Sequence, residues 1–394
     1  MQISFLFVFT GLILIGYLFE IISPKTRIPN ILILLGLGML SQQLVETFHW
    51  QKPNFDKLLP ELGTVGLILI VLEGTLELNL TRSKIPLLKK TVSLAFFSIV
   101  SLSLTFGAYF FYQGYPIKQS ILNALPLTII SSAIAIPTAK MLSRKDKEFI
   151  IFESSLSDIL GVTIFNFFLI NEVVNIPSLI NFGGEIIISL LFSIAAAIML
   201  IFVLSRLKHK VKFMPIIALV LFLYAFAKGY HLPGLILILT FGLVLANIEK
   251  LNLIPFLKDF NITHLKSEIT RFEEITVELT FLVRVAFFLI FGFTIELSSL
   301  LDLHSLLLSM SGFFIIIFFR VVQLLLMKLP LFPLAFVAPR GLITILLFVS
   351  IPSSNKILFI NQTVITQVII ISSLFMMIAT MTERDKTKNE ELNP

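Results

Sequence analysis

The sequence predicts an all-α polytopic membrane protein, and three observations support this fold class. Of the 394 residues, 57% are hydrophobic and only 14% are charged, with a mean hydropathy of +0.98. Soluble domains of ordinary composition carry about 25% charged residues. Apolar stretches long enough to cross a bilayer recur along the whole chain, and the basic residues fall mainly between alternate pairs of them.

Thirteen apolar stretches predict thirteen transmembrane helices, because a helix needs about 20 residues to cross the hydrocarbon core. The expected spans are 3–22, 28–46, 58–77, 88–112, 119–141, 149–171, 183–205, 212–228, 232–247, 275–297, 303–326, 330–351 and 360–381. The polar segment 249–274 is amphipathic and is expected to lie on the membrane surface. The chain starts with an apolar stretch that has no basic region and no cleavage site, so the first span is expected to stay uncleaved.

The distribution of lysine and arginine predicts the orientation. With the N-terminus outside, 22 of the 30 basic residues face the inside and five the outside, while Arg284, Arg320 and Arg340 lie within spans. Such a bias is the positive-inside signal of a plasma membrane protein, in bacteria the inner membrane, and it places the tail 382–394 in the cytoplasm. It also accounts for the net charge of +6 without a nucleic-acid partner.

Thirteen spans allow two inverted repeats of six helices within a transmembrane domain covering 1–381. The first repeat would cover about 1–171, a linker helix 183–205 and the second repeat 212–381. The fifth span is interrupted near Pro137 and the twelfth at Ala338-Pro339-Arg340-Gly341. Discontinuous helices at matching places indicate an ion site near the bilayer midplane, although an ordinary proline kink gives the same local pattern.

Six ionisable side chains fall inside expected spans: Glu73, Glu153, Asp158, Arg284, Arg320 and Arg340. Each costs roughly 2.5–3.5 kcal/mol at the bilayer centre on insertion scales. These groups must therefore pair with one another or line water, and intramembrane charges of this kind mark functional sites.

The sixth span concentrates oxygen atoms on one helix face. Ser154 and Asp158 stack at a spacing of four residues, and so do Glu153 and Ser157. Hard cations prefer oxygen ligands, so this face is a candidate cation site. The alternative for Asp158 is a structural ion pair with an arginine, and this is the favoured interpretation for Glu153. Serines such as Ser154 and Ser157, taken alone, more often serve in helix packing.

These motifs give the sequence a resemblance to the monovalent cation:proton antiporter superfamily, especially its Na+/H+ exchangers. Residues 152–158 resemble the Gly-Glu-Ser-Leu-Leu-Asn-Asp motif, and 69–78 resemble the Phe-Glu-Gly segment of the third span. Residues 338–342 are similar to the Gly-x-Arg-Gly turn of the second broken helix. Residues 318–322 resemble the helix with a basic residue beside the ion site. Residues 27–29 and 232–235 fit weaker signatures.

The resemblance implies roles for the candidate residues. Asp158 would bind Na+ and the proton in turn, Ser154 would help to ligate the ion, and carbonyl groups around Ala135 would complete the shell. Glu153 and Arg320 would form a buried salt bridge. Ser157 would be a further ion- and proton-binding residue, Arg340 would lie by the opposing broken helix, and Glu73 and Pro137 would support the site. The family plan also implies crossed discontinuous helices, separate core and dimerisation bundles, a homodimer, a role in pH homeostasis and no cofactor.

Two residues depart from the family pattern. Ser157 stands where Asn or Asp precedes the key aspartate, and Ala135-Ile136-Pro137 stands where Thr-Asp-Pro is usual. The second departure removes an expected carboxylate. A K+/H+ exchanger or K+ efflux transporter, and a transport-inactive sensor or scaffold, therefore stay open as alternatives. The roles of Lys140 and Arg284 also stay open.

An intramembrane enzyme is disfavoured because the motifs that would carry its chemistry are missing. The five histidines form no His-Glu-x-x-His pattern, cysteine is absent, and no Gly-rich phosphate loop occurs. Desolvation favours the protonated form of a buried carboxyl group, whereas a bound Na+ favours its charged form. A single exchangeable carboxylate thus predicts electroneutral one-for-one exchange by alternating access.

Overall fold

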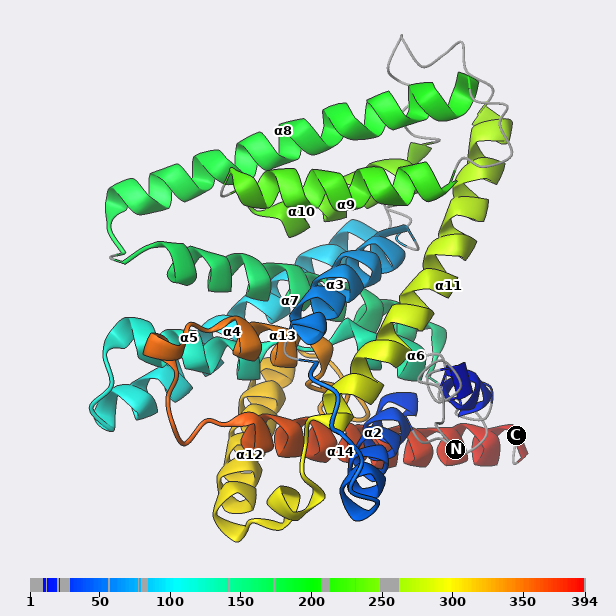
Figure 1. Cartoon of the computed structure of the whole chain (residues 1–394). Coiled ribbons are helices and arrows are strands. Elements are labelled where there is room, and N and C mark those ends of the chain that lie inside the picture. The colour runs from blue at the N-terminus through cyan, green and yellow to red at the C-terminus, as the bar shows by residue number, and fades with distance from the viewer. Residues whose placement is uncertain are drawn as a thin grey trace. The chain divides into compact units, whose positions relative to one another are not determined.

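A computed structural model defines the structure of most of the chain (Figure 1). It describes residues 10–11, 13–19, 21, 29–55, 57–76, 78, 84–139, 142–172, 174–206, 213–230, 232–248 and 262–392. Lys140 and residues 249–261 of the expected surface segment lie outside this description.

The described part of the chain is all-α, with thirteen α-helices and no strand. In chain order the helices are α2 (Asn30–Thr47), α3 (Leu58–Leu76), α4 (Ile85–Tyr112), α5 (Ile117–Thr128), α6 (Ser132–Ala139), α7 (Arg144–Ile170), α8 (Ile176–Arg206), α9 (Phe213–Gly229), α10 (Gly234–Ala246), α11 (Ile262–Phe293), α12 (Leu303–Leu326), α13 (Leu342–Ser350) and α14 (Gln362–Leu392). Two short 3-10 helices, η4 (Leu297–Leu301) and η5 (Ser353–Asn355), lie in the connections. The predicted fold class is confirmed.

Length and composition qualify eight candidate membrane spans among the described residues, with α5 and α6 counted together as one. Two shorter apolar helices, α9 and α10, occupy the eighth and ninth expected spans. Each of the second to thirteenth expected spans therefore contains at least one helix. Helix formation satisfies every backbone group within the segment, which is why apolar sequence in lipid takes this form.

One predicted boundary is wrong. Helix α11 already begins at Ile262, so residues 262–274 continue the tenth span instead of forming a separate surface segment. Helix α14 runs on to Leu392, but its apolar part, Gln362–Thr382, agrees with the expected span 360–381. In both segments the polar residues belong to a helix that starts or ends outside the apolar stretch, and hydropathy alone detects only the apolar part.

The chain divides into two compact units whose boundaries cut through α3, α4, α7 and α11. The first unit contains residues 1–64, 90–161 and 282–394, and the second contains 65–89 and 162–281. Both units combine segments from the two halves of the chain. The two inverted repeats and their linker helix stay a prediction.

In the second unit, α8, α9 and α10 pack against one another as three apolar helices (Figure 1). The buried Ser193 hydroxyl of α8 donates a hydrogen bond to the Leu237 carbonyl of α10 at 2.6 Å. Asn247, just after α10, donates to the Leu78 carbonyl at 3.0 Å. These two hydrogen bonds link neighbouring segments at defined positions among otherwise apolar contacts.

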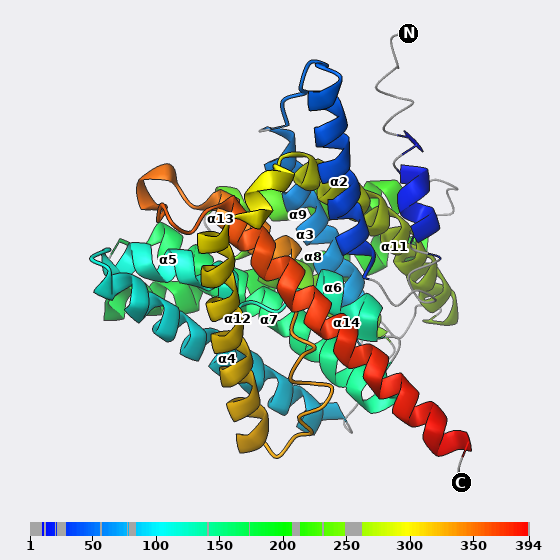
Figure 2. The ribbon, with the colours of Figure 1, turned by 90° about the horizontal axis from the view of Figure 1, so that it is seen from below.

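In the first unit, α12 packs against α14, and the short helix α13 packs against α5 (Figure 2). Asp302 caps the N-terminus of α12, and its carboxylate accepts hydrogen bonds from the Ser305 hydroxyl at 2.5 Å and the Ser305 amide at 2.9 Å. These bonds hold the pKa of the exposed Asp302 carboxyl below its usual value. Aspartate at this position satisfies an amide that the first turn leaves open.

Candidate cation site

The fifth span is broken between α5 and α6, where residues 129–131 are not helical. Distant parts of the first unit satisfy the amides freed by this break. The Ile130 amide donates to the Ser157 hydroxyl at 2.9 Å, and the Ser131 amide donates to the Pro339 carbonyl at 2.9 Å. Unwound backbone at membrane depth is tolerated only where protein or water supplies such partners.

The second break precedes α13, and it covers a longer segment than the sequence predicted. Residues 331–341 form turns and extended chain, so only the second half of the twelfth span is helical. The Arg340 amide donates to the Ser372 hydroxyl of α14 at 3.0 Å. A β-carbon on Gly341 would lie 2.6 Å from Ser131 Oγ, so glycine lets the two breaks come this close. The interrupted spans therefore meet at their breaks.

Asp158 lies near the middle of α7 and is 1% exposed. Its Oδ2 accepts hydrogen bonds from the Ser132 hydroxyl and from the Ser132 amide, the latter at 3.2 Å, at the N-terminus of α6. The positive end of the helix dipole favours the charged form of this carboxylate. Its other oxygen, Oδ1, is buried and has no hydrogen-bond partner among the described residues, and the same holds for Ser131 Oγ.

Arg340 faces the opposite helix end of the first break. The guanidinium, 1% exposed, donates to the carbonyls of Leu127 at 2.8 Å and Thr128 at 3.3 Å, where α5 ends. It also donates to the Ala338 carbonyl at 2.7 Å. A cation at the C-terminus of a helix compensates the negative end of its dipole. Arg340 and Asp158 thus stabilise the two facing helix ends from opposite sides.

Glu153 and Arg320 form a two-pronged ion pair between α7 and α12. Arg320 donates from both terminal nitrogens to the two carboxylate oxygens, one of these contacts measuring 2.7 Å. Its Nε donates to the Leu334 carbonyl at 3.2 Å. The side chains are 1% and 2% exposed, respectively. This two-pronged contact commits both carboxylate oxygens of Glu153 to Arg320.

The structure places the other predicted site residues less centrally. The Ser157 hydroxyl accepts a hydrogen bond from the Ile130 amide and so stabilises the break beside Asp158. The Ser154 hydroxyl donates to the Ile150 carbonyl of its own helix at 2.8 Å. Ala135 and Pro137 lie inside α6 rather than at the break, and Glu73 is half-buried in the second unit.

Sequence reasoning missed Ser131 at the break and Ser132, which contacts Asp158. Both lie within the fifth expected span, but the interruption was expected near Pro137. A local signal exists, because serine is favoured where a helix begins. Two adjacent serines in an apolar run mark the start of α6 better than the proline that follows at its sixth position.

Comparison with known proteins places this geometry in a family. A profile described as "Sodium/hydrogen exchanger, transmembrane" matches residues 6–383, nearly the whole chain. The chain belongs to the sodium/hydrogen exchanger family. Membership makes it a multi-pass membrane transporter of the cation/proton antiporter class rather than a member of an enzyme class.

Solved structures of the sodium proton antiporter MjNhaP1 from Methanocaldococcus jannaschii share the family fold. The structure at pH 8 is 20% identical, with a TM-score of 0.68 over 98% of this chain and 97% of that one. A second, from an electron-microscopy map, is 19% identical, with a TM-score of 0.67 over 97% and 95% of the two chains. A search of curated protein sequences finds no significant match.

Proposed function

We propose that this exchanger moves Na+ in one direction and H+ in the other at a single site centred on Asp158. The observation that carries the proposal is the half-satisfied carboxylate: Ser132 holds Oδ2, while the buried Oδ1 has no hydrogen-bond partner within the described structure. A buried polar atom without a partner is costly, so it calls for a ligand. A proton or a cation supplies one.

The oxygen atoms around Asp158 match the preference of a hard cation. Ser131 Oγ is likewise buried without a partner and belongs to the residue next to Ser132, so it is the first additional ligand we propose. Ser154 donates its hydroxyl proton to its own helix and keeps oxygen lone pairs for an ion. Carbonyl groups near Ala135 stay proposed ligands from the family resemblance. Na+ is a transported substrate here, and we propose no cofactor.

Electroneutral exchange follows from the charges around the site. Three carboxylates are buried in the described structure: Glu153, Asp158 and Glu268. Glu153 is paired with Arg320, and Glu268 in the second unit lies 3.8 Å from Arg271. Asp158 is left as the one with no basic partner. One carboxylate that accepts either H+ or Na+ exchanges one charge for one charge.

Alternating access completes the proposed mechanism. The site lies where two discontinuous spans meet, which is the arrangement used by transporters that rock one bundle against another around a central site. If crossing requires an occupied Asp158, the two ions move in opposite directions. Homodimer formation and the outside location of the N-terminus belong to the same proposal.

The decisive experiment is flux in proteoliposomes with Na+, K+ or Li+ outside and a pH-sensitive dye inside. We expect wild-type protein to release protons when Na+ is added, at a rate that an imposed membrane potential leaves unchanged. Asp158→Asn should abolish this movement. Asp146→Asn is the matched control, because Asp146 lies in the first turn of the same helix, where it is half-buried and 12 residues before Asp158.

Each alternative has its own outcome in this assay. A response to K+ alone would replace Na+ as the substrate, and wild-type protein that moves no cation would favour a sensor or scaffold. Exchange that persists in Asp158→Asn would refute the site. A rate that scales with voltage would refute one-for-one stoichiometry.

A further inference from the structure

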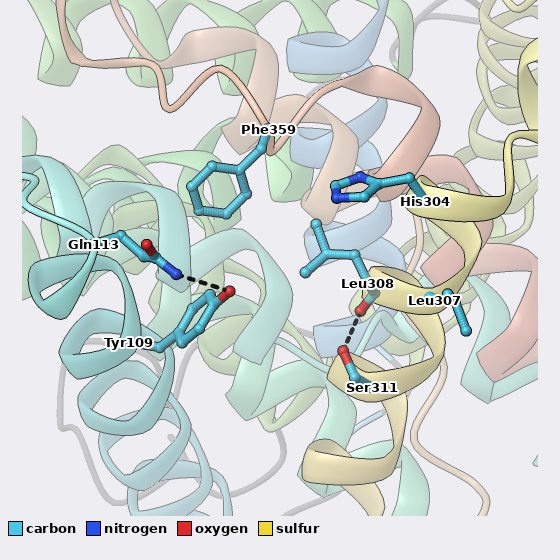
Figure 3. A pocket seen from close by; sticks show the side chains of 7 residues that line it. All are labelled: Tyr109, Gln113, His304, Leu307, Leu308, Ser311 and Phe359. Atoms are coloured by element: carbon cyan, nitrogen blue, oxygen red, sulfur yellow. Dashed lines mark hydrogen bonds between the residues drawn. The ribbon is translucent and has the colours of Figure 1, made fainter.

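A cavity of about 420 Å³ opens between α4 and α12, away from the cation site. Figure 3 shows the α4 side chains on one side and those of α12 on the other. The lining includes Tyr109 from α4 and Gln113 just after it, His304, Leu307 and Leu308 from α12, and Phe359 from the connection before α14. All belong to the first unit.

The apolar part of this cavity is firmly built. The ring of Phe359 packs edge-on against three aromatic rings, with centroid distances of 6.4 Å to Tyr109, 5.7 Å to Phe110 and 5.9 Å to Tyr115. Leu308 faces this cluster across the cavity, and Leu307 borders the cavity on the same helix (Figure 3). Edge-to-face aromatic contacts hold such a wall in one position.

The polar part of the cavity offers hydrogen-bond donors and no carboxylate. The Gln113 amide donates to the Tyr109 hydroxyl at 3.3 Å with one of its two N–H groups (Figure 3). The exposed His304 side chain makes no hydrogen bond within the described structure, and the Asp302 carboxylate lies near enough to interact with it electrostatically. Ser311 is already committed to the Leu308 carbonyl at 2.8 Å. The nearby Asp302 carboxylate is occupied by Ser305. The lining therefore suits an acceptor-rich, negatively charged group.

The position of the cavity along the helices identifies the surrounding medium. Both α4 and α12 are candidate membrane spans, and the cavity lies at the last turn of one and the first turns of the other. Large apolar side chains further along both helices are exposed, for example Leu104 at 65% and Phe318 at 63%. Apolar side chains exposed on spanning helices face acyl chains, and tyrosine marks the headgroup level. The cavity therefore opens where headgroup and acyl chain meet.

We propose that this cavity binds one phospholipid of the adjacent leaflet. The phosphate accepts hydrogen bonds from Gln113 and His304, and the first part of an acyl chain lies against Leu307, Leu308 and Phe359. The volume lies within the range of small-molecule pockets and holds the glycerol-phosphate region rather than a whole lipid. A bound lipid would bridge α4 and α12, the helix that also carries Arg320.

Native mass spectrometry of the full chain, titrated with phosphatidylglycerol or with diacylglycerol, tests the proposal. The double variant Gln113→Leu/His304→Leu removes both donors and should bind phosphatidylglycerol at least about a hundredfold more weakly, because two hydrogen bonds to a charged group are lost. Diacylglycerol, which has no phosphate, should bind wild type and double variant equally. Ser311→Ala is the matched control and should behave as wild type.

A second variant guards against a folding defect in the first. Leu307→Trp fills the cavity from a position that is 64% exposed, and it should weaken phosphatidylglycerol and diacylglycerol alike. Equal phosphatidylglycerol binding by wild type and the double variant would overturn the phosphate assignment. Unchanged binding of both lipids by Leu307→Trp would overturn the cavity assignment.

Discussion

Glu153 and Asp158 lie five residues apart on α7, and their surroundings give them different chemistry. Glu153 faces Arg320, so both of its oxygens are fixed by a permanent charge. Asp158 accepts hydrogen bonds from Ser132 at a helix N-terminus, which stabilise an anion without neutralising it. We therefore propose that the first carboxylate serves structure and that the second exchanges one small cation for another.

Removing one partner of the buried pair should be strongly destabilising. In Glu153→Gln the Arg320 guanidinium stays buried without a counter-charge, and breaking such a pair costs about 3–5 kcal/mol. We expect a loss of this size in the free energy of unfolding, measured by denaturant titration in mixed micelles. The double variant Glu153→Leu/Arg320→Met removes both charges and should regain most of the loss. Equal stability of Glu153→Gln and wild type would contradict a structural role.

Ser132 should set the balance between proton and Na+ at Asp158. Its hydroxyl stabilises the charged carboxylate, and a hydrogen bond to a charged group contributes about 1.5–3 kcal/mol. In Ser132→Ala the proton competes better, so the apparent KM for Na+ should rise roughly tenfold near neutral pH and approach wild type at high pH. Proteoliposome flux at several pH values measures this. Ser103→Ala, a buried serine of α4, is the control and should leave KM unchanged.

At the scale of elements, the sequence located both broken spans but not the break in the first. Pro137 was the only local signal used, yet it is accommodated within α6. The break occurs at residues 129–131 because their freed amides donate hydrogen bonds to Ser157 and Pro339. In addition, the Arg340 guanidinium donates hydrogen bonds to the carbonyl groups at the end of α5. These partners lie between 27 and more than 200 residues away along the chain, where no local pattern reports them.

Helices α2 and α11 cross in the first unit at a point where only glycine fits. A β-carbon on Gly38 would lie 2.8 Å from Gly292 Cα and 2.8 Å from the Phe293 amide nitrogen. Backbone atoms cannot yield as a flexible side chain can. Small residues allow this close approach in membranes, where van der Waals packing drives helix association.

Gly38→Ala should therefore destabilise the protein by about 1–3 kcal/mol, the range found for overpacking of a filled interior. Gly36→Ala is a matched control two residues away in α2, since its β-carbon would have no neighbour within 4 Å. This control should be neutral or gain up to about 1 kcal/mol from better helix propensity. Denaturant titration in mixed micelles compares both variants, and equal stability of the two would argue against the tight crossing.

At the scale of the whole molecule, hydropathy and charge distribution were sufficient to predict the fold class. Within a bilayer the backbone must form all its hydrogen bonds internally, and few structures allow this. Motif order was sufficient for the family, although the identity to structures of that fold is only 19–20%. The complete cation site could not be predicted without the tertiary structure. Glu153, Asp158 and Arg320 are recognisable in the sequence as charges in apolar spans, whereas Ser131 and Ser132 gain their importance only from their position at the break.

The predicted orientation can be measured directly because the chain contains no cysteine. A single cysteine at Gln51, exposed between α2 and α3, should lie outside, and one at Lys145, exposed at the start of α7, should lie inside. In intact cells a membrane-impermeant maleimide should label Gln51→Cys at once and Lys145→Cys only after permeabilisation. The reverse pattern would place the N-terminus inside and would set 22 basic residues against the positive-inside rule. Because both positions are exposed and outside the candidate cation site, transport by each variant should be retained, which shows that the labelled protein is folded.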